Sequence, residues 1–369
     1  HALVSYRYVV SLALLLVVAS PVAAQSSPYD QQVRRLVSQI RRDARTPRAV
    51  LSLLELTGYE RFASPGTVQR ELVRLSQDRR LSPPVRSLAS VHAAFGRFGE
   101  GEYQEVSERI AELGYLTRVR IIGGFDDEGK QGFGRVYPPE ELRNEPVALD
   151  AQYPGKLRPV EWREYPADLG RYGLIDFDAT TRPYQNACAY VETFVTLDSA
   201  RPMALYAGVG GAYKVWVNGE EVMADPIYRG ITLDRQSAVF AGREGANRIL
   251  AKVCVQSGRW GMYLRLAEAD GSPPQNFSVD AAAAPQAAPA PATPITLPAA
   301  PGAPLSWFEA RVESDADNAA AAYDLARYLA WTESEEPTDR RSRQLAERAA
   351  ELRPTAEHLL YAAELAETR

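Results

Sequence analysis

Histidine is scarce in this chain. The 369 residues include only His1, His92 and His358, and none of them falls in the middle of the sequence, where the β-strand patterns described below lie. A histidine-based metal site, or a nucleophile activated by histidine, is therefore excluded from that middle region. The sequence contains no phosphate-binding loop either, and we expect no cofactor and no metal.

Lysine is almost absent, and the chain carries no excess of positive charge. Only four of the 42 basic residues are lysines, and the formal net charge is -5. A nucleic-acid-binding protein usually presents a basic face, so this balance excludes nucleic acid as a partner. The arginine excess is what a GC-rich bacterial genome produces; binding of phosphate groups is the alternative explanation.

Cysteine is limited to Cys188 and Cys254. An oxidising compartment permits a disulfide between them. However, strand alternation turns Cys254 away from the predicted core, and Cys188 opens a different strand, so the geometry of pairing is not assured. The sequence predicts free or only loosely coupled thiols.

Long apolar runs are missing after the first 24 residues. There, Arg7 precedes an apolar run from Val9 to Ala19, and small residues end at Ala24, which together are typical of a cleaved signal peptide. The run is short for a transmembrane helix. We predict a signal peptide over residues 1–24 and an exported protein, periplasmic or extracellular, with no membrane span after cleavage; a buried first helix is the alternative.

Helical patterns occupy residues 25–116. Val33, Leu36, Val37 and Ile40 recur at the i, i+3, i+4, i+7 spacing of one apolar helix face. Further short amphipathic stretches follow, separated by Gly, Pro and Ser. The pattern predicts an α-helical region made of short paired helices.

Strand patterns take over in residues 117–270. Short alternating runs bounded by turn residues, without helical patterns between them, are typical of an antiparallel sandwich or barrel. The candidate strands are Arg118–Ile122, Tyr190–Leu197, Met203–Ala207, Tyr213–Val217, Ser237–Phe240, Arg248–Val255 and Met262–Ala267. The fold class is therefore α+β and multidomain.

A hairpin is predicted within Lys214–Val222. Asn218-Gly219 interrupts the alternation, and this dipeptide favours the type I′ turn, which needs positive φ at both central residues. Trp216 then lies on the opposite sheet face from Val215 and Val217, and we expect it to be a packing residue.

The succession of strand motifs resembles the galactose-binding-like jelly roll of some glycoside hydrolases. The resemblance covers Arg118 to Ala269 and is closest to secreted myxobacterial-type proteins, where this domain lies beside tetratricopeptide repeats and often a transglutaminase-like domain. Many relatives carry acidic residues before the hairpin, where this chain has GVGGAY, so no metal role is expected there. The motifs that carry the resemblance are, in order, IIGGF, VEWREY, AYVETFV, YKVWVNGEEV, GANRILAKV and WGMYLRL.

Residues 271–305 are rich in Ala and Pro, and they predict a disordered tether. Helical spacing returns in residues 306–369, where Leu329-Ala330 recurs as Leu365-Ala366. Small residues and a closing proline make this segment resemble truncated tetratricopeptide repeats. The residues concerned are Ala346, Ala349, Leu352 and Pro354. The chain begins with His and ends in mid-pattern, which suggests a fragment of a longer protein.

Trp260, between two glycines, is the preferred candidate for stacking on a sugar ring, and Arg259 beside it can donate hydrogen bonds to hydroxyl groups. Tyr228 and Arg229 offer the same pairing, and the two pairs are candidates for opposite walls of one site. The alternative, which we favour, is that Trp260 covers the end of the sandwich. The acidic run Asp126–Glu128 is a weaker candidate, for Ca²⁺, against the simpler expectation of solvated acids.

Three functions remain open. The leading one is a noncatalytic exported scaffold that binds other proteins through its helical repeats. The second is a carbohydrate-binding module for envelope or extracellular polysaccharide. The third is the front part of a transglutaminase-like enzyme whose catalytic domain follows residue 369.

Overall fold

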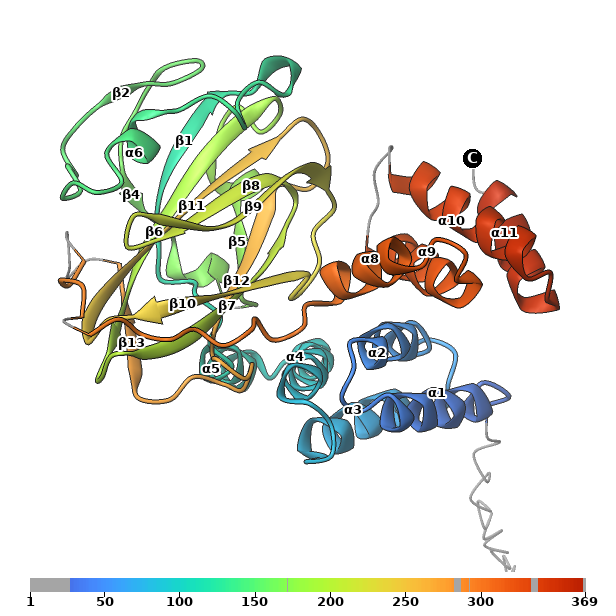
Figure 1. The fold of residues 1–369 in the computed structure, drawn as a ribbon. Helices are drawn as coiled ribbons and strands as arrows, with labels where there is room; N and C mark the ends of the chain where they lie inside the picture. Colours follow the sequence, from blue (N-terminus) through green and yellow to red (C-terminus); the bar gives the residue numbers. More distant parts are fainter. Residues whose placement is uncertain (1–26, 171, 282–286, 292, 333–337, 368–369) are drawn as a thin grey trace, which may run out of the picture.

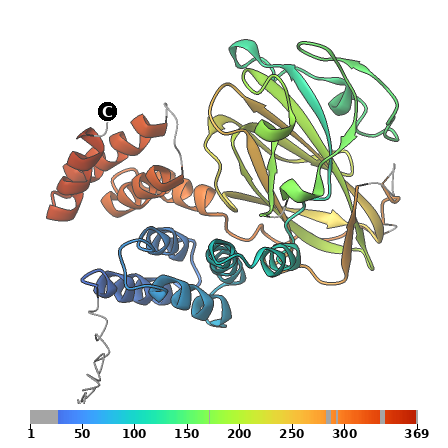
Figure 2. The same cartoon turned by 180° about the vertical axis from the view of Figure 1, so that it is seen from behind.

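The computed structural model describes residues 27–170, 172–281, 287–291, 293–332 and 338–367. The chain has an α+β fold in which an antiparallel β-sandwich lies against a layer of helices (Figure 1 and Figure 2). The predicted signal peptide lies outside the described residues. None of the helices in the described part combines the length and apolar character needed to span a membrane.

The N-terminal region is helical, as its spacing predicts. Val33, Leu36, Val37 and Ile40 are all buried in one hydrophobic core. Helix starts follow local chemistry: prolines occupy the first turn of the fourth helix, where no intrahelical N–H is needed. The helices are α1 (Asp30–Arg42), α2 (Arg48–Gly58), α3 (Thr67–Gln77), α4 (Pro83–Gly99) and α5 (Tyr103–Glu112).

The C-terminal helices pack directly on the N-terminal ones, with α8 and α9 beside α2 (Figure 1). Leu325 and Tyr328 belong to the same core as α1 to α5. Arg48 pairs with Asp324 at 3.1 Å. The two helical regions, which the sequence predicts as separate, therefore form one layer. These helices are α8 (Pro304–Ser314), α9 (Ala319–Thr332), α10 (Thr338–Leu352) and α11 (Ala356–Glu367).

The larger sheet of the sandwich has seven strands in the order β4-β1-β6-β11-β8-β9, with β13 also paired to β6. Every pairing within it is antiparallel. Its strands are β1 (Arg120–Asp126), β4 (Arg163–Glu164), β6 (Ala187–Leu197), β8 (Gly211–Val217), β9 (Glu220–Arg229), β11 (Gly245–Val255) and β13 (Phe277–Asp280).

The facing sheet has four antiparallel strands in the order β10-β7-β12-β5, and a separate pair joins β2 to β3. Its strands are β5 (Leu174–Asp176), β7 (Arg201–Val209), β10 (Gln236–Gly242) and β12 (Gly261–Glu268). The remaining elements are β2 (Tyr153–Pro154), β3 (Pro159–Val160), α6 (Pro138–Glu141), α7 (Phe177–Thr180), η1 (Glu128–Lys130) and η2 (Ala167–Gly170).

A hydrophobic core fills the space between the two sheets. Along β11, Ile249, Ala251 and Val253 point into this core, while Lys252 and Cys254 lie on the opposite face, as strand alternation predicts. All seven candidate strands overlap observed strands. The candidate strands do not include the short β2, β3, β4 and β5, or β13.

The predicted hairpin is confirmed between β8 and β9. Asn218 and Gly219 have φ of 51° and 86°, so both central residues are left-handed, as a type I′ turn requires. Trp216 is buried with Leu250 on the outer face of the seven-stranded sheet, which confirms the packing interpretation.

The prediction of free thiols is wrong. Cys188 and Cys254 form a disulfide with their Cα atoms 4.0 Å apart. The two residues are directly opposite each other in the β6–β11 register, and both side chains lie on the outer face of the sheet. The sequence shows that Cys254 faces away from the inner core but not that Cys188 does the same on the neighbouring strand.

The segment predicted to be a disordered tether is ordered where the structure describes it. Near its start, β13 extends the sheet beside β6. The Ala288 N–H donates to the Ala246 carbonyl at 2.7 Å, and the Ser237 hydroxyl donates to the Pro301 carbonyl at 2.7 Å. Backbone hydrogen bonding, which composition does not reveal, thus fixes this segment along the sandwich. Residues 282–286 and 292 lie outside the described part.

Candidate functional site

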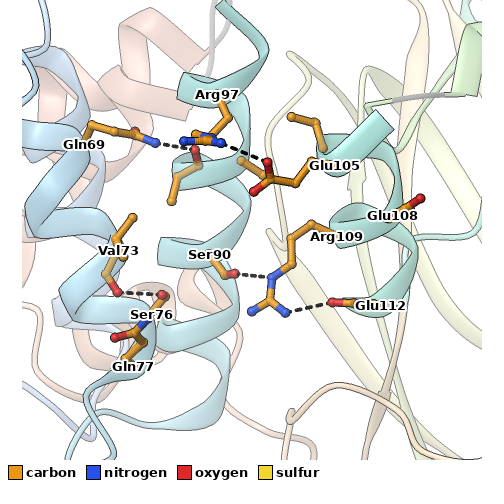
Figure 3. Close-up of a pocket in the computed structure, with 13 residues that line it drawn as sticks. Gln69, Val73, Ser76, Gln77, Ser90, Arg97, Glu105, Glu108, Arg109 and Glu112 are labelled. Atoms are coloured by element: carbon orange, nitrogen blue, oxygen red, sulfur yellow. Dashed lines mark hydrogen bonds and ion pairs between the residues drawn. The ribbon is translucent and has the colours of Figure 1, made fainter. Parts of the chain in front are cut away.

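An open groove of about 560 Å³ lies across α3, α4 and α5 (Figure 3). Helix α4 packs against both of its neighbours and forms the floor, while α3 and α5 form the walls. The groove is lined by Gln69, Val73, Ser76, Gln77, Ser90, Ala93, Ala94, Arg97, Glu105, Val106, Glu108, Arg109 and Glu112.

Small side chains on α4 keep the floor low. Ser90, Ala93 and Ala94 are spaced i, i+3, i+4, so they share one helix face. The α3 wall is held to this floor by Gln69, whose amide donates to the Ala93 carbonyl at 2.7 Å. The α3 side chains that line the groove are uncharged, and Val73 among them is exposed.

The opposite wall carries ion pairs (Figure 3). The guanidinium of Arg97, on α4, donates to Glu105 at 2.9 Å. Arg109, on α5, donates to the Ser90 hydroxyl at 2.9 Å and to Glu112 at 2.9 Å. These pairs are largely exposed, so each one contributes little to stability and can be exchanged for a charge on a ligand at small cost.

Acidic residues outnumber basic ones on this wall. Glu105, Glu108 and Glu112 recur at i, i+3 and i+7 along α5, against Arg109 on the same helix and Arg97 on the α4 floor. Glu108 accepts a hydrogen bond from Gln104 at 3.0 Å, and none of the ion pairs found in the described chain includes it. The groove therefore offers one uncharged wall and one wall with surplus negative charge.

Trp260, the candidate sugar contact, has no open face: its side chain is 0% exposed, in agreement with the favoured expectation that it is a packing residue. The indole lies in the core between the sheets and packs on Phe177, with ring centroids 5.0 Å apart. Its backbone N–H donates to the Asp178 carboxylate at 3.0 Å. The segment that contains β5 and α7 covers the end of the sandwich here, which the two flanking glycines did not reveal.

The other predicted site residues do not gather around Trp260. Arg259 is exposed and pairs with Asp176 at 3.5 Å. Tyr228 lies in the cluster on the outer face of the seven-stranded sheet, whereas Trp260 lies in the core between the sheets. Arg229 is buried and pairs with Asp225 at 2.9 Å. The expected arrangement of opposite walls is therefore not formed.

The acidic run Asp126–Glu128 is solvated at its two ends, as expected, and buried only at Asp127. Lys156 pairs with Asp126 at 3.0 Å and with Glu128 at 2.6 Å. Asp127 is fully buried and accepts hydrogen bonds from the Tyr228 hydroxyl at 2.9 Å and the Gly132 N–H at 2.8 Å. Burial raises the pKa of Asp127 to about 6.

Asp127 also belongs to the one group of potential metal ligands found among the described residues. Its carboxylate lies within 4.8 Å of both cysteine sulfurs. Those sulfurs are bonded to each other, and a disulfide is not the thiolate ligand that metals need. As found here, the group is a packing cluster.

Comparisons with known proteins assign no family. No family model matches this chain. No curated protein matches it either. Solved structures match less than half of this chain, and only weakly. A β-glucosidase from Kluyveromyces marxianus is 8% identical over 41% of this chain and 16% of its own, with a TM-score of 0.25. An uncultured Clostridium sp. β-glucuronidase is 14% identical over 42% and 28%, with a TM-score of 0.25.

A β-glycosidase from Bacteroides vulgatus gives a similar result: 16% identity over 42% of this chain and 20% of its own, with a TM-score of 0.22. This chain thus spans well under two thirds of each of these proteins. At TM-scores this low the likenesses carry no argument about function.

The α3–α5 groove was not among the sites expected from the sequence. Two signals for it are present in the sequence: the small residues Ser90, Ala93 and Ala94, and the acidic series on α5. Either signal alone is common on solvated helices. Only the packing of α4 between α3 and α5 turns them into the floor and wall of one groove.

Proposed function

We propose that this protein is an exported, noncatalytic scaffold that binds other proteins through the α3–α5 groove. The observation that carries the proposal is the pairing of an uncharged wall with an acid-rich wall across a floor of small residues. An open groove of this kind suits a chain segment that lies along it, because contacts are available over three helices.

The chemistry of the groove favours a partner segment with basic side chains. Glu108 offers a carboxylate that has no cation partner in the described chain. The carboxylates of Glu105 and Glu112 are paired with arginines, but both pairs are open to solvent. Amide and hydroxyl groups on α3 can accept hydrogen bonds from the backbone of the partner or donate hydrogen bonds to it. Complementary charge of this type mainly sets specificity and the rate of association.

We further infer that the C-terminal helices are of tetratricopeptide type and that the sandwich is a jelly roll of the galactose-binding-like kind. In support of the first, Ala346 and Ala349 are fully buried where α10 packs on α9, and Pro354 follows the end of α10. In support of the second, the chain passes repeatedly between two antiparallel sheets from β6 to β13.

Peptide display on the immobilised protein tests the proposal. A random peptide library is selected on the unmodified protein, and each enriched peptide is then measured by fluorescence polarisation. We expect enriched peptides to be rich in Lys and Arg, and we expect Glu108→Lys/Glu112→Lys to weaken their binding about tenfold, because two attractive charges become repulsive.

Glu347→Lys/Glu351→Lys on α10 is the matched control, since it makes the same change of charge at the same i, i+4 spacing on exposed helical surface outside the groove. It is expected to leave binding within about twofold, as far surface charges are screened. Equal loss in both variants, or enrichment of peptides without basic residues, contradicts the proposal.

The polysaccharide alternative and the enzyme alternative remain separate proposals. A polysaccharide site predicts retention on a glycan column that is insensitive to the groove variants. A transglutaminase-like enzyme predicts a longer reading frame with a Cys and, well downstream, a His.

A further inference from the structure

A small polar cavity, of about 260 Å³, lies at the end of the seven-stranded sheet where β8 turns into β9. Its wall combines that turn, the start of β11, the residues that follow α6 and residues 287–289 of the Pro-rich segment. Three arginines line it: Arg143, Arg243 and Arg248. Its volume is just below the usual range for drug-sized ligands, about 300–1,000 Å³, so the cavity suits a smaller molecule.

A buried asparagine fixes the wall that carries Arg243. Asn247 is 0% exposed; its side-chain amide donates to the Arg243 carbonyl at 2.8 Å, and its Oδ1 accepts the Arg243 N–H at 2.8 Å. The same Oδ1 accepts a hydrogen bond from the Asn218 amide at 3.0 Å, so the β8–β9 turn is joined to the segment before β11. A wall held in this way loses little further freedom when a ligand binds.

The guanidinium of Arg248 is held on two sides. It pairs with Glu192 at 2.6 Å and donates to the carbonyls of Arg143 and Glu145 at 2.8 Å and 2.7 Å. These bonds use Nε and Nη1, and no hydrogen bond to a described residue uses Nη2. The side chain is therefore fixed and still has an amino group to donate.

Arg143 and Arg243 bond only to the backbone. The Arg143 guanidinium donates to the carbonyls of Gly219 at 3.2 Å and Glu140 at 2.9 Å, and that of Arg243 donates to the Ala288 carbonyl at 2.5 Å. Neither one pairs with a carboxylate in the part of the chain that the structure describes. Each keeps an accessible Nη2 group without a hydrogen-bond partner in that part.

Positive charge exceeds negative charge at this cavity. The charge of Arg248 is balanced by Glu192. The one carboxylate that lines the cavity belongs to Glu145, which is exposed, and it faces the unpaired charges of Arg143 and Arg243. The other lining side chains are uncharged. The balance therefore favours an anionic ligand.

The number of guanidinium groups favours a phosphate over a carboxylate. The three arginines come from three separate segments of the chain, so their Nη2 groups approach a ligand from different directions. A carboxylate offers two oxygens in one plane and a single charge, whereas a phosphate monoester offers three strong acceptor oxygens and nearly two charges at neutral pH. Because a water molecule takes up about 30 Å³, the cavity also has room for more than a bare phosphate ion.

We infer that this cavity binds the phosphate group of a small phosphate monoester. The phosphate oxygens accept hydrogen bonds from Arg143, Arg243 and Arg248, whose planar guanidinium groups match the geometry of phosphate. The cavity shares no lining residue with the α3–α5 groove, and the inference does not depend on the function proposed for that groove.

Isothermal titration calorimetry of the full chain tests the inference, with glucose 6-phosphate as the probe. The buffer is free of phosphate and at about pH 7.5, above the second pKa of a phosphate ester at about 6. We expect saturable binding of glucose 6-phosphate, about tenfold weaker binding of glucose 6-sulfate, which carries one charge, and no detectable binding of glucose, because charge-assisted hydrogen bonds are the stronger ones. Inorganic phosphate should bind no more tightly than the ester.

Three variants define the site. Arg143→Gln and Arg243→Gln each remove one unpaired cation and are expected to weaken binding of glucose 6-phosphate about tenfold. Glu145→Gln is expected to strengthen it about twofold, because an exposed anion that repels the ligand is gone. Arg182→Gln is the matched control, since the Arg182 guanidinium also donates to backbone carbonyls but lies outside the cavity, and it should leave binding unchanged.

Several outcomes overturn the inference. These are failure of glucose 6-phosphate to bind, and equal binding by the parent and Arg243→Gln. Weaker binding after Glu145→Gln means that the site prefers a cation. Binding of the sulfate as tight as that of the phosphate removes the argument from charge, and tighter binding of inorganic phosphate assigns the site to the free ion. Melting temperatures show which variants are folded; if Arg143→Gln is destabilised, Arg243→Gln and Glu145→Gln decide.

Discussion

Buried charges hold the long loop of residues 127–162 on the outer face of the seven-stranded sheet. Lys252 is 0% exposed; its ammonium pairs with Glu140 at 3.0 Å and donates to the Arg135 carbonyl at 2.6 Å. Arg248 pairs with Glu192 at 2.6 Å and donates to the Arg143 carbonyl at 2.8 Å. Because these cations bond the backbone of the loop, they fix its position as well as balancing buried acids.

Trp260→Ala is expected to lower the free energy of unfolding by about 3–5 kcal/mol, because it removes a fully buried indole from the core between the sheets. Denaturant unfolding of the two proteins measures the difference. Tyr184→Ala, at an exposed aromatic ring, is the control and is expected to cost much less. Unchanged stability after Trp260→Ala would contradict the buried position of this side chain.

Because of the buried carboxyl group of Asp127, we expect the free energy of unfolding to fall as pH rises from about 4 to about 6. Burial raises its pKa in the folded state to about 6, so the folded protein binds the proton more tightly than the unfolded chain, whose carboxyl titrates near about 4. Stability from this group is therefore complete at low pH and is lost as pH rises through the folded pKa.

The check is Asp127→Asn, which keeps an acceptor for the Tyr228 hydroxyl and cannot ionise. The stability of the parent, relative to this variant, should fall between pH 4 and pH 6.5 when urea midpoints are compared. Asp150→Asn, at an exposed site, should show no such trend. A parallel pH dependence in the parent and Asp127→Asn would refute the prediction.

Strand pairing between β6 and β11 is the element that organises the sandwich. The two strands are paired along their whole length, from Gly245 opposite Leu197 to Val255 opposite Ala187. This long register places one face of each strand in the inner core and the other under the loop of residues 127–162. It also brings Cys188 opposite Cys254, which links strands 66 residues apart in sequence.

Cys188→Ala/Cys254→Ala is expected to lower the free energy of unfolding by about 2–4 kcal/mol, because the crosslink restricts the unfolded chain over a long loop. Thiol titration of the unfolded, unreduced protein should find no free thiol. Addition of reductant should destabilise the parent by a similar amount and leave the double variant unchanged. Two free thiols in the parent would show that the crosslink is absent.

Local patterns predicted the elements better than their pairing. The Asn218-Gly219 turn and the inward face of β11 follow from φ preferences and period-two alternation, which act within a few residues. The disulfide and the burial of Trp260 depend on which strands and loops become neighbours, and that is decided over many residues. The groove was missed for the same reason, since its walls come from different helices.

At the scale of the whole molecule, the helical layer is built from both ends of the chain. The sandwich is inserted between α5 and α8, and the Pro-rich segment returns along its surface to the helices (Figure 1). Glu55 pairs with Arg327, and a Cβ atom on Gly58 would contact the Trp331 ring at 2.5 Å. From these contacts and the shared core we expect α2 and α9 to unfold together.

Leu325→Asp tests that coupling. Leu325 on α9 is 0% exposed in the core shared with α1 to α5, so an aspartate there is buried without a partner and is expected to destabilise the layer by about 3 kcal/mol or more. Hydrogen exchange should quicken in α2 as well as in α9, while β6 and β11 stay protected because their pairing lies outside the layer. Leu359→Asp makes the same chemical change at a side chain that is 51% exposed on α11, and it should leave α2 unaffected. If exchange quickens only in α9 after Leu325→Asp, the N-terminal helices are a stable unit by themselves, and the single layer is an association of two independent parts.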